Sequence, residues 1–367
     1  MTARALDRLT ELVLIETPSG HTRGLLALYE QLREWADPLF GRAGEVITVS
    51  GVPHLLWRAR TQPSVLLLGH ADTVWPLGTL DGWPLEVTGC KATGPGVFDM
   101  KAGLIIAIEA LALAGNLDHV SLLVTGDEEI GSGTSRALLE RSAHNCSAVL
   151  VLEPNLDGAL KTARKGASMY RLAIEGRAAH AGLEPEAGVN SLLELAFQAL
   201  AIAELGDADR GTTVTPTVGV AGTVTNAVPA SAELHVDVRA WELVELQRVH
   251  TALNALTPSV PGATLTMHGA INRPPMDPAV SGDLLATLRR VAERAGLGPI
   301  ATVSVGGGSD GNFTSALGIP TLDGLGALGD GAHARHEWVD VTSISKRATL
   351  VAALLRELAP MVGPPYL

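Results

Sequence analysis

Three short, continuous apolar segments constrain the fold of this chain more than any other feature. They lie in SVLLLGHADTV, HVSLLVTGDEE and SAVLVLEP, which begin at residues 64, 119 and 147. Apolar runs of this length are typical of strands that are buried on both faces of a parallel sheet. Helical stretches such as KAGLIIAIEALALAG (101–115) and TSRALLERSA lie between them. This alternation predicts an α/β fold, in which helices flank a mixed sheet.

The middle of the chain has a different pattern. SAELHVDVRA at 231–240 alternates apolar and polar residues, as a strand with one buried face does, and so does SMYRLAIEG at 168–176. Two further strands are expected at 215–224 and 263–270, and helices at 190–205 and about 242–256. The resulting order, β-α-β-β-α-β, predicts a small two-layer module.

This module interrupts the larger α/β pattern. We therefore expect a first part of one domain at 1–165, an inserted domain at 166–277 and the second part of the first domain at 278–367. In the inserted domain the helix at 190–205 has an apolar stripe at helical spacing. The stripe consists of Leu192, Leu195, Ala196, Ala199, Leu200 and Ala203.

Composition excludes several classes of partner. The chain has 27 basic and 39 acidic residues, a net charge of −12 and no basic cluster, so it could not neutralise the phosphates of a nucleic acid. No apolar run is long enough to span a bilayer, and the first residues interleave charges with apolar positions, unlike a secretion signal. Cys90 and Cys146 lack CxxC spacing and are expected to be reduced or buried thiols. We expect a cytoplasmic protein that binds neither nucleic acid nor membrane.

Acids and histidines follow the predicted strands of the large domain. They are His70 and Asp72, Asp99, Glu128 and Glu129, Glu153, and His333 and His336. Ligands of open α/β sheets bind beyond the carboxyl ends of the strands, where these acids would repel one another unless a cation neutralised them. Histidines together with several carboxylates form a mixed nitrogen and oxygen ligand set that suits zinc, cobalt or manganese.

The segment TGPGVFDMKAG at 93–103 has an alternative interpretation as a phosphate-binding loop. It lacks the GxxxxGK[ST] pattern of such loops. Asp99 also stands where a dinucleotide fingerprint has its third glycine. Nucleotide binding is therefore not expected.

Six short motifs between about 65 and 340 carry a resemblance to a known family. GHADTV, GPGVFDMKAG, DEEIGSGTSR, LEP, GRAAHAG and HARHEWV resemble, in order and spacing, the signatures of the di-zinc aminoacylase/carboxypeptidase metallopeptidases. Among these the bacterial glutamate carboxypeptidases are most similar. The resemblance implies a zinc-peptidase-like catalytic domain with an inserted lid and dimerisation domain.

The resemblance also implies two Zn²⁺ ions per subunit, with Co²⁺ or Mn²⁺ as alternatives. Asp99 would bridge the two ions. His70 and Glu153 would hold one ion, while Glu129 and His333 would hold the other. His336 lies three residues from His333, but the family has another residue type at that place, so we favour His333.

Two further acids receive roles near the metals. Asp72 would contact His70 and fix its tautomer. Glu128 would be the general base, which takes a proton from water and passes it to the leaving amine. Adjacent residues at a strand end point in different directions, so Glu129 can bind metal while Glu128 faces the water.

The resemblance assigns roles in the inserted domain as well. His180 would reach the active site of the partner subunit and stabilise the oxyanion, which requires a homodimer formed through the lid domain. Asn226 would bind substrate and Arg239 would bind its α-carboxylate. Arg273, in a loop, would contact a glutamate side chain.

A glycine-rich segment late in the chain completes the expected site. In SVGGGSDGNF at 304–313, the backbone of Gly307 and Gly308 could contact the substrate.

Together these observations predict a metallo-carboxypeptidase or amidohydrolase that releases a C-terminal amino acid, glutamate above all, from a peptide or an N-acyl amino acid. The alternatives are an N-acyl-amino-acid deacylase of the acetylornithine or succinyl-diaminopimelate type, and a dipeptidase. A non-catalytic, metal-dependent binding protein is a more remote alternative. The sequence separates the first three poorly because they differ in the shape of the substrate pocket.

Overall fold

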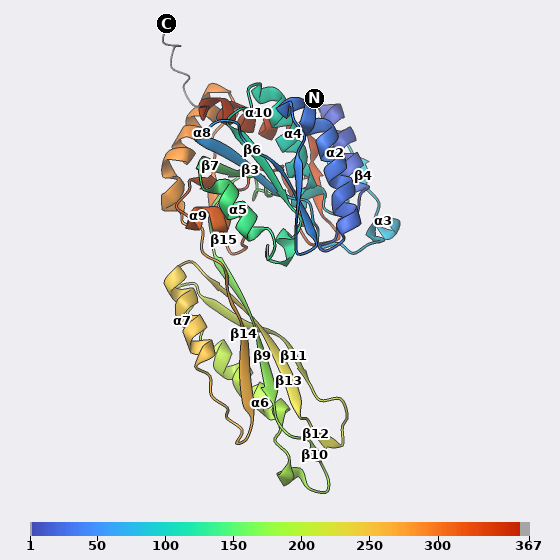
Figure 1. The fold of residues 1–367 in the computed structure, drawn as a ribbon, viewed down its shortest axis with the longest axis vertical. Helices are drawn as coiled ribbons and strands as arrows, with labels where there is room; N and C mark the ends of the chain where they lie inside the picture. Colours follow the sequence, from blue (N-terminus) through green and yellow to red (C-terminus); the bar gives the residue numbers. More distant parts are fainter. Residues whose placement is uncertain (1, 360–367) are drawn as a thin grey trace. The chain divides into compact units, whose positions relative to one another are not determined.

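The computed structural model describes residues 2–359 and divides the chain into two compact units (Figure 1). Of the described residues, unit 1 comprises 2–163, 277–305 and 309–359. Unit 2 comprises residues 164–276 and 306–308. Unit 2 is therefore inserted into the chain of unit 1.

Unit 1 is built around a six-stranded mixed sheet with the order β1-β2-β6-β3-β7-β16. Strands β6, β3, β7 and β16 run parallel, while β1 and β2 are antiparallel to their neighbours. The strands span Glu45–Val49 (β1), Val52–Trp57 (β2), Ser64–His70 (β3), Val120–Thr125 (β6), Cys146–Val151 (β7) and Thr321–Leu322 (β16). The three apolar segments of the sequence thus form three adjacent central strands.

Helices cover both faces of this sheet, and the alternation of side chains along β3 explains why. Val65 and Leu67 pack into the main core, whereas Leu66 and Leu68 pack into a second core on the other face. The main core is covered by α1 (Thr2–Val13), α2 (Thr22–Phe40), α4 (Ala102–Ala114), α8 (Gly282–Arg294) and α10 (Val341–Glu357). The second core is covered by α5 (Arg136–Ala143) and α9 (Gly311–Ala316).

Smaller elements of unit 1 lie beside the main sheet. Strands β17 (Gly329–Asp330), β18 (Trp338–Asp340), β5 (Lys91–Thr93) and β4 (Glu86–Thr88) form a second sheet in that order, and β15 (Thr302–Val305) pairs with β8 (Leu160–Arg164). Short helical segments are α3 (Thr79–Gly82), η1 (Val97–Lys101), η2 (Glu128–Ile130) and η4 (Pro278–Ser281). Pairing of β18 with β5 fixes the segment after His333 beside the chain that leads into η1.

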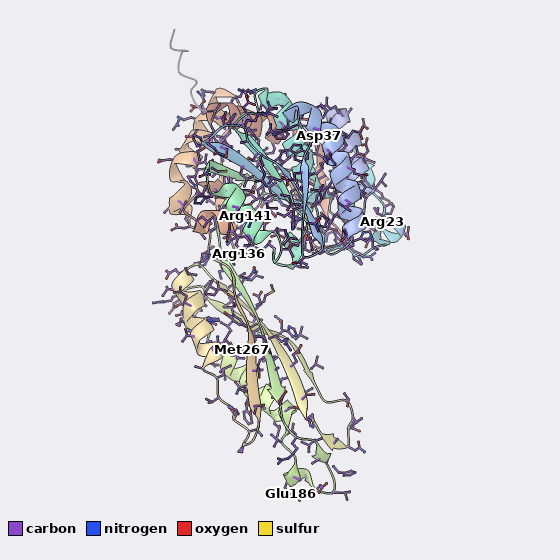
Figure 2. All side chains as sticks on the ribbon, in the orientation of Figure 1. Arg23, Asp37, Arg136, Arg141, Glu186 and Met267 are labelled. Atoms are coloured by element: carbon purple, nitrogen blue, oxygen red, sulfur yellow. The ribbon has the colours of Figure 1, made fainter. Side chains whose placement is uncertain are left out.

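Unit 2 contains a four-stranded antiparallel sheet with the order β11-β13-β9-β14. Its strands are β9 (Gly166–Glu175), β11 (Thr213–Ala221), β13 (Ser231–Ala240) and β14 (Thr264–Arg273), to which Met267 belongs (Figure 2). Helices α6 (Ser191–Ala203) and α7 (Leu243–Asn254) share one apolar core with it. A small ribbon of β10 (Ala179–His180) and β12 (Ala227–Val228), with the turn η3 (Pro185–Ala187), completes the unit.

This architecture confirms the predicted fold class. Unit 1 has a mixed sheet flanked by helices, and the main strands and helices of unit 2 follow the order β-α-β-β-α-β. Along β13 the residues Ala232, Leu234, Val236 and Val238 are buried, as their alternation predicts. Within residues 2–359 we find no helix that combines the length and the apolarity needed to cross a membrane.

The apolar stripe predicted for α6 is divided between the core and the surface of unit 2. Leu195 and Ala199 of the stripe pack against the core of unit 2. Leu192 and Leu200 are instead 49% and 72% exposed, and Leu193 and Phe197 beside them are exposed too. The buried positions are instead Ser191, Glu194, Gln198 and Ile202. The Glu194 carboxylate accepts hydrogen bonds from the backbone of residues 259 and 260, which explains a polar residue on the inner face.

Candidate active site

The predicted metal ligands on the main sheet meet at one edge. His70 is the last residue of β3, Glu129 follows β6 within η2, and Glu153 follows β7 by two residues. Because β6, β3 and β7 are parallel neighbours, their carboxyl ends lie at the same edge of the sheet. Asp99 comes from η1, just before α4, and His333 comes from the loop between β17 and β18.

The turn after β6 accounts for the sequence DEEIGSG. The backbone N–H of Gly131 donates a 2.9 Å hydrogen bond to the carbonyl oxygen of Glu128 and closes the turn η2. Gly131 has φ +95°, a conformation that a side chain disfavours. Asp127 is buried and its carboxylate accepts hydrogen bonds from the N–H and the hydroxyl of Thr134. Asp127 therefore stabilises the turn, whereas the side chains of Glu128 and Glu129 are available to the candidate active site.

Asp99 lies at the centre of the site, between the two histidines. Its Oδ1 is 3.2 Å from Nε2 of His70, and its Oδ2 is 3.3 Å from Nε2 of His333. Each histidine has a second acid: Glu153 Oε1 is 3.4 Å from His70 Nε2, and Glu129 Oε2 is 3.1 Å from His333 Nε2. One carboxylate is thus shared by two histidine–glutamate pairs. His336, the alternative to His333, is exposed.

The pKa values of these groups follow from their contacts. Burial disfavours charge on His70, but contacts with Asp72, Asp99 and Glu153 outweigh it and raise its pKa well above the usual value. Asp99 and Glu129 raise the pKa of His333 to about 10. Burial raises the pKa of Glu129, whereas the two histidines hold the pKa of Asp99 below its usual value despite burial. The cluster of acids therefore stabilises positive charge at its centre.

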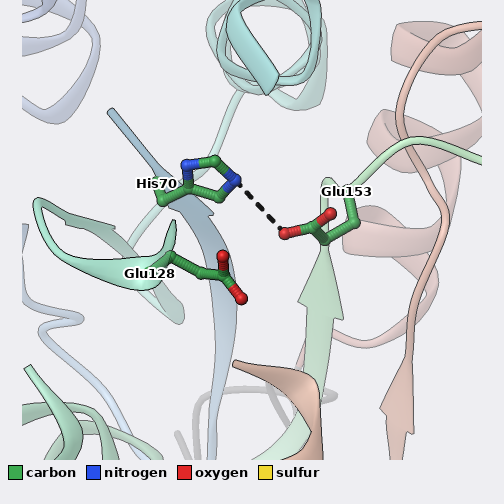
Figure 3. Close-up of side chains that lie close together, drawn as sticks. All are labelled: His70, Glu128 and Glu153. Atoms are coloured by element: carbon green, nitrogen blue, oxygen red, sulfur yellow. Dashed lines mark ion pairs between the residues drawn. The ribbon is translucent and has the colours of Figure 1, made fainter. Parts of the chain in front are cut away.

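The side-chain chemistry fits a metal ion. Glu129 Oε1 is buried and has no hydrogen-bond partner among the described residues, as expected of an oxygen that binds a cation. Ligand atoms of His70, Asp99 and Glu129 lie within 4.8 Å of one another, and so do those of His70, Glu128 and Glu153. Figure 3 shows the second group, with the Glu128 carboxylate directed toward the pair formed by His70 and Glu153. The set of imidazoles and carboxylates matches the preferences of zinc and related metals.

The structure modifies the expected contact between Asp72 and His70. Nδ1 of His70 is 2.9 Å from the backbone carbonyl oxygen of Asp72, whereas the Asp72 carboxylate lies 3.6 Å away. A carbonyl oxygen only accepts, so Nδ1 carries the proton and Nε2 faces the acids. The carboxylate is engaged elsewhere: it accepts hydrogen bonds from the backbone N–H groups of Glu128 and Glu129 and from the Ser19 hydroxyl. The strand ends at His70, so its alternation does not extend to residue 72.

Glu337 is a residue of this site that the sequence patterns did not indicate. It is completely buried, and its carboxylate accepts a hydrogen bond from the backbone N–H of Asp99 at 3.0 Å. Burial raises its pKa to about 7, although its hydrogen bonds with backbone N–H groups act in the opposite direction. Its place four residues after His333, in the motif HARHEWV, was the available signal.

His180 and Asn226 are neighbours in unit 2. His180 lies in β10, which pairs with β12, and the N–H of Ala181 donates a hydrogen bond to the carbonyl oxygen of Asn226. His180 is exposed. Arg239 is half-buried on the polar face of β13, where it forms a two-pronged ion pair with Asp237 at 2.8–2.9 Å.

Arg273 and the glycine loop also belong to unit 2. Arg273 was expected in a loop, but it is the buried last residue of β14 and pairs with Ala167 of β9, because the strand continues through it. The carbonyl oxygens of Gly307 and Gly308 accept hydrogen bonds from Arg164 at 3.0 and 3.3 Å. Arg164 is a buried residue that the sequence patterns did not indicate.

Comparisons with known proteins bear on this site. Residues 66–357 match peptidase family M20/M25/M40. The chain is 30% identical over 370 residues to carboxypeptidase G2 of Pseudomonas sp. (strain RS-16), which covers 96% of this chain and 89% of that protein. It is 29% identical over 324 residues to a succinyl-diaminopimelate desuccinylase of Granulibacter bethesdensis, covering 81% of this chain and 83% of the other.

A solved structure shares the fold. An M20 family metallo-carboxypeptidase from Sulfolobus solfataricus superimposes with a TM-score of 0.77 over 96% of this chain and 98% of that one, at 16% identity. These findings confirm the resemblance that the sequence motifs indicated and the prediction of an enzyme. The chain belongs to peptidase family M20/M25/M40 and is an M20 metallohydrolase.

Proposed function

We propose that this protein is a homodimeric di-zinc hydrolase that cleaves an amide bond and releases a C-terminal amino acid, with glutamate as the preferred product. The observation that carries the proposal is the position of Asp99, whose two carboxylate oxygens face two different histidines at 3.2 and 3.3 Å. Such an arrangement suits two metal ions that share one carboxylate. His70 and Glu153 would hold one ion, and Glu129 and His333 the other.

Two metal ions at this place would supply an activated water and polarise the scissile carbonyl group. The protein's own contribution is then proton transfer and orientation. Glu128, held by its backbone N–H on Asp72, would accept a proton from the water and deliver it to the leaving amine. The buried carbonyl oxygen of Asp72 keeps the proton of His70 on Nδ1, so that Nε2 is available as a ligand.

The choice of substrate rests on the relatives and on unit 2. Similarity to carboxypeptidase G2 favours release of a C-terminal amino acid, and similarity to a desuccinylase supports an N-acyl-amino-acid deacylase as the second candidate. Arg239 is the proposed partner of the substrate carboxylate, since a planar guanidinium binds carboxylates with two hydrogen bonds. It already pairs with Asp237 in this way, so a substrate would compete with or share that acid. Asn226, Arg273, Gly307 and Gly308 remain proposed contacts.

A set of exposed apolar side chains on α6 supports the homodimer. Leu192, Leu193, Phe197 and Leu200 are each about half exposed or more. Val218 and Val220 of the edge strand β11 are also exposed, but they lie on the face of the sheet away from α6, opposite His235 and Glu233 of β13. An exposed apolar helix face of this kind is typical of a surface that binds another protein. An edge strand is also able to pair with its copy across a two-fold axis. We propose that His180 acts in the partner's active site within this dimer.

Substrate class is tested by amino-acid release from a panel of N-acylated glutamates, other N-acyl amino acids, succinylated diamino acids and simple dipeptides. The protein is stripped with a chelator and reloaded with zinc, and the stripped protein is the control. We expect glutamate release only after reloading. If the reloaded protein instead hydrolyses the succinylated substrates, the metal site stands and the function is that of a deacylase. Hydrolysis by the stripped protein would contradict a metal-dependent mechanism.

A further inference from the structure

Glu337 holds the chain that carries Asp99 by an unusual number of hydrogen bonds. Its Oε1 accepts from the backbone N–H groups of Phe98 and Asp99 at 2.9 and 3.0 Å. Its Oε2 accepts from the backbone N–H of Gly96 and the indole N–H of Trp75, both at 3.0 Å. All four partners donate, so the position requires an acceptor at both oxygens. A glutamine would direct its amide N–H₂ at one pair of these donors.

These bonds connect segments that are far apart in the sequence. Glu337 lies 238 positions after Asp99 and 262 positions after Trp75 in the sequence. Trp75 follows the strand that ends at His70, while Glu337 lies four residues after His333. One buried carboxylate thus joins the three segments that carry His70, Asp99 and His333.

The two proposed metal positions differ in how the rest of the fold supports them. His70 is 2% exposed at the end of β3, and Glu153 is buried just after β7, so the sheet positions both. His333 has a side chain that is 53% exposed and a left-handed backbone with φ +62°, in a loop. The position of His333 relative to Asp99 therefore depends on contacts outside the sheet.

We infer that Glu337 is a positioning residue that fixes Asp99 relative to His333 and thereby sets the affinity of the metal position formed by Asp99, Glu129 and His333. The position formed by His70 and Glu153 depends on it much less. This inference rests on the proposed di-metal site. Removal of the hydrogen-bonding partners behind metal ligands typically lowers metal affinity 10- to 100-fold, which gives the size of the expected effect.

Glu16 provides a matched control. Its carboxylate also accepts backbone hydrogen bonds from a neighbouring loop, from Gly78 at 2.8 Å and Leu80 at 3.0 Å. Among the described residues, its side-chain hydrogen bonds reach only the loop at 78–80 and not the segments that carry Asp99 and His333, unlike those of Glu337. A Glu16→Gln variant therefore measures how much Co²⁺ affinity changes when a carboxylate that holds a different loop is replaced.

The test is a Co²⁺ titration of the stripped protein, followed by calorimetry and by the visible absorption of bound Co²⁺. The wild type and Glu16→Gln should bind two equivalents alike. In Glu337→Gln the first equivalent should bind with the wild-type spectrum and affinity, and the second should bind about 10- to 100-fold more weakly. Trp75→Phe removes one of the four donors to Glu337 and keeps an aromatic ring beside Trp83. It should therefore lower the affinity for the second Co²⁺ less than Glu337→Gln does. This variant replaces Glu337→Gln in the test if Glu337→Gln does not fold.

Two outcomes would overturn the inference. Either Glu337→Gln binds both equivalents as the wild type does, or both equivalents weaken together with a fall in the melting temperature of the stripped protein, as a merely structural role predicts. A failure of the proposed function gives a different result from a failure of this inference. In that case the wild type binds two Co²⁺ ions with the differential effect of Glu337→Gln, yet hydrolyses no member of the substrate panel.

Discussion

Oδ1 of Asp72 accepts a 3.1 Å hydrogen bond from the backbone N–H of Glu128, 56 residues further along the chain. Oδ2 of the same carboxylate accepts from the backbone N–H of Glu129 at 3.1 Å and from the Ser19 hydroxyl at 2.7 Å. Asp72 is completely buried, so these bonds are not replaced by water. The orientation of the proposed base and of its neighbouring ligand thus depends on one acid beneath them.

Asp72→Asn should lower kcat and metal affinity together, because the amide N–H₂ would face a backbone N–H. We expect a loss of about 10- to 100-fold in each. Steady-state kinetics and metal titration measure the two effects. Ser19→Ala is the control, since it removes a donor to Asp72 and leaves both backbone bonds in place. An Asp72→Asn enzyme with wild-type kinetics would show that the turn holds its shape without this acid.

Glu128→Gln should abolish most of the activity and leave the metal content unchanged. Loss of a general base typically costs about 10²- to 10⁴-fold in rate. The measurements are kcat and the number of metal ions per chain. Glu129→Gln, which changes the adjacent side chain, should instead reduce metal content. Because Glu128 lies near His70 and Glu153, loss of one metal ion in Glu128→Gln would identify it as a ligand rather than a base.

His180→Ala should lower kcat by about 10²- to 10³-fold, the usual cost of removing an oxyanion donor, while both metal ions remain bound. His268→Ala is a suitable control, because His268 is also an exposed histidine of unit 2. Metal loss in His180→Ala, or equal rates in the two variants, would contradict the proposed role.

Leu200→Glu should convert the proposed dimer to monomers, because it places a charge on a side chain that is 72% exposed within the apolar stripe of α6. Light scattering after size-exclusion chromatography measures the mass. Leu14→Glu, at a position of unit 1 that is 62% exposed, controls for the added charge. A monomeric wild type, or a dimeric Leu200→Glu protein, would place the dimer contact elsewhere or remove it.

Glu245 should make the stability of unit 2 depend on pH. Hydrogen bonds from Arg248, Thr212 and Arg210 lower its pKa to about 2. A depressed pKa means that the stabilisation is fully present above the ordinary value near 4.5 and is lost as the pH falls through 2. The difference in urea midpoint between the wild type and Glu245→Gln should therefore be largest above pH 5 and shrink toward pH 2. A difference that stays constant with pH would assign the effect to packing.

Local patterns of the sequence were sufficient for the fold class. Strands such as Ser64–His70 are continuous apolar runs because both of their faces are buried, and this leaves a signal within a few residues. The same signal placed His70, Glu129 and Glu153 at strand ends, where parallel neighbours meet. The geometry of a parallel sheet thus brought separate motifs of the sequence to one place.

Only the tertiary structure decided the remaining features. Glu337 and Asp72 bind backbone N–H groups of distant segments, and a backbone N–H is the same in nearly every residue, so their partners leave no side-chain pattern to detect. The stripe of α6 has the spacing of a buried face, yet only part of it packs against the core: Leu195 and Ala199 do, while Leu192 and Leu200 are exposed. Glu194 and Gln198 find their hydrogen-bond partners on the inner side. Periodicity specifies that a helix has an apolar face, but only the packing of the whole unit specifies which face is turned inward.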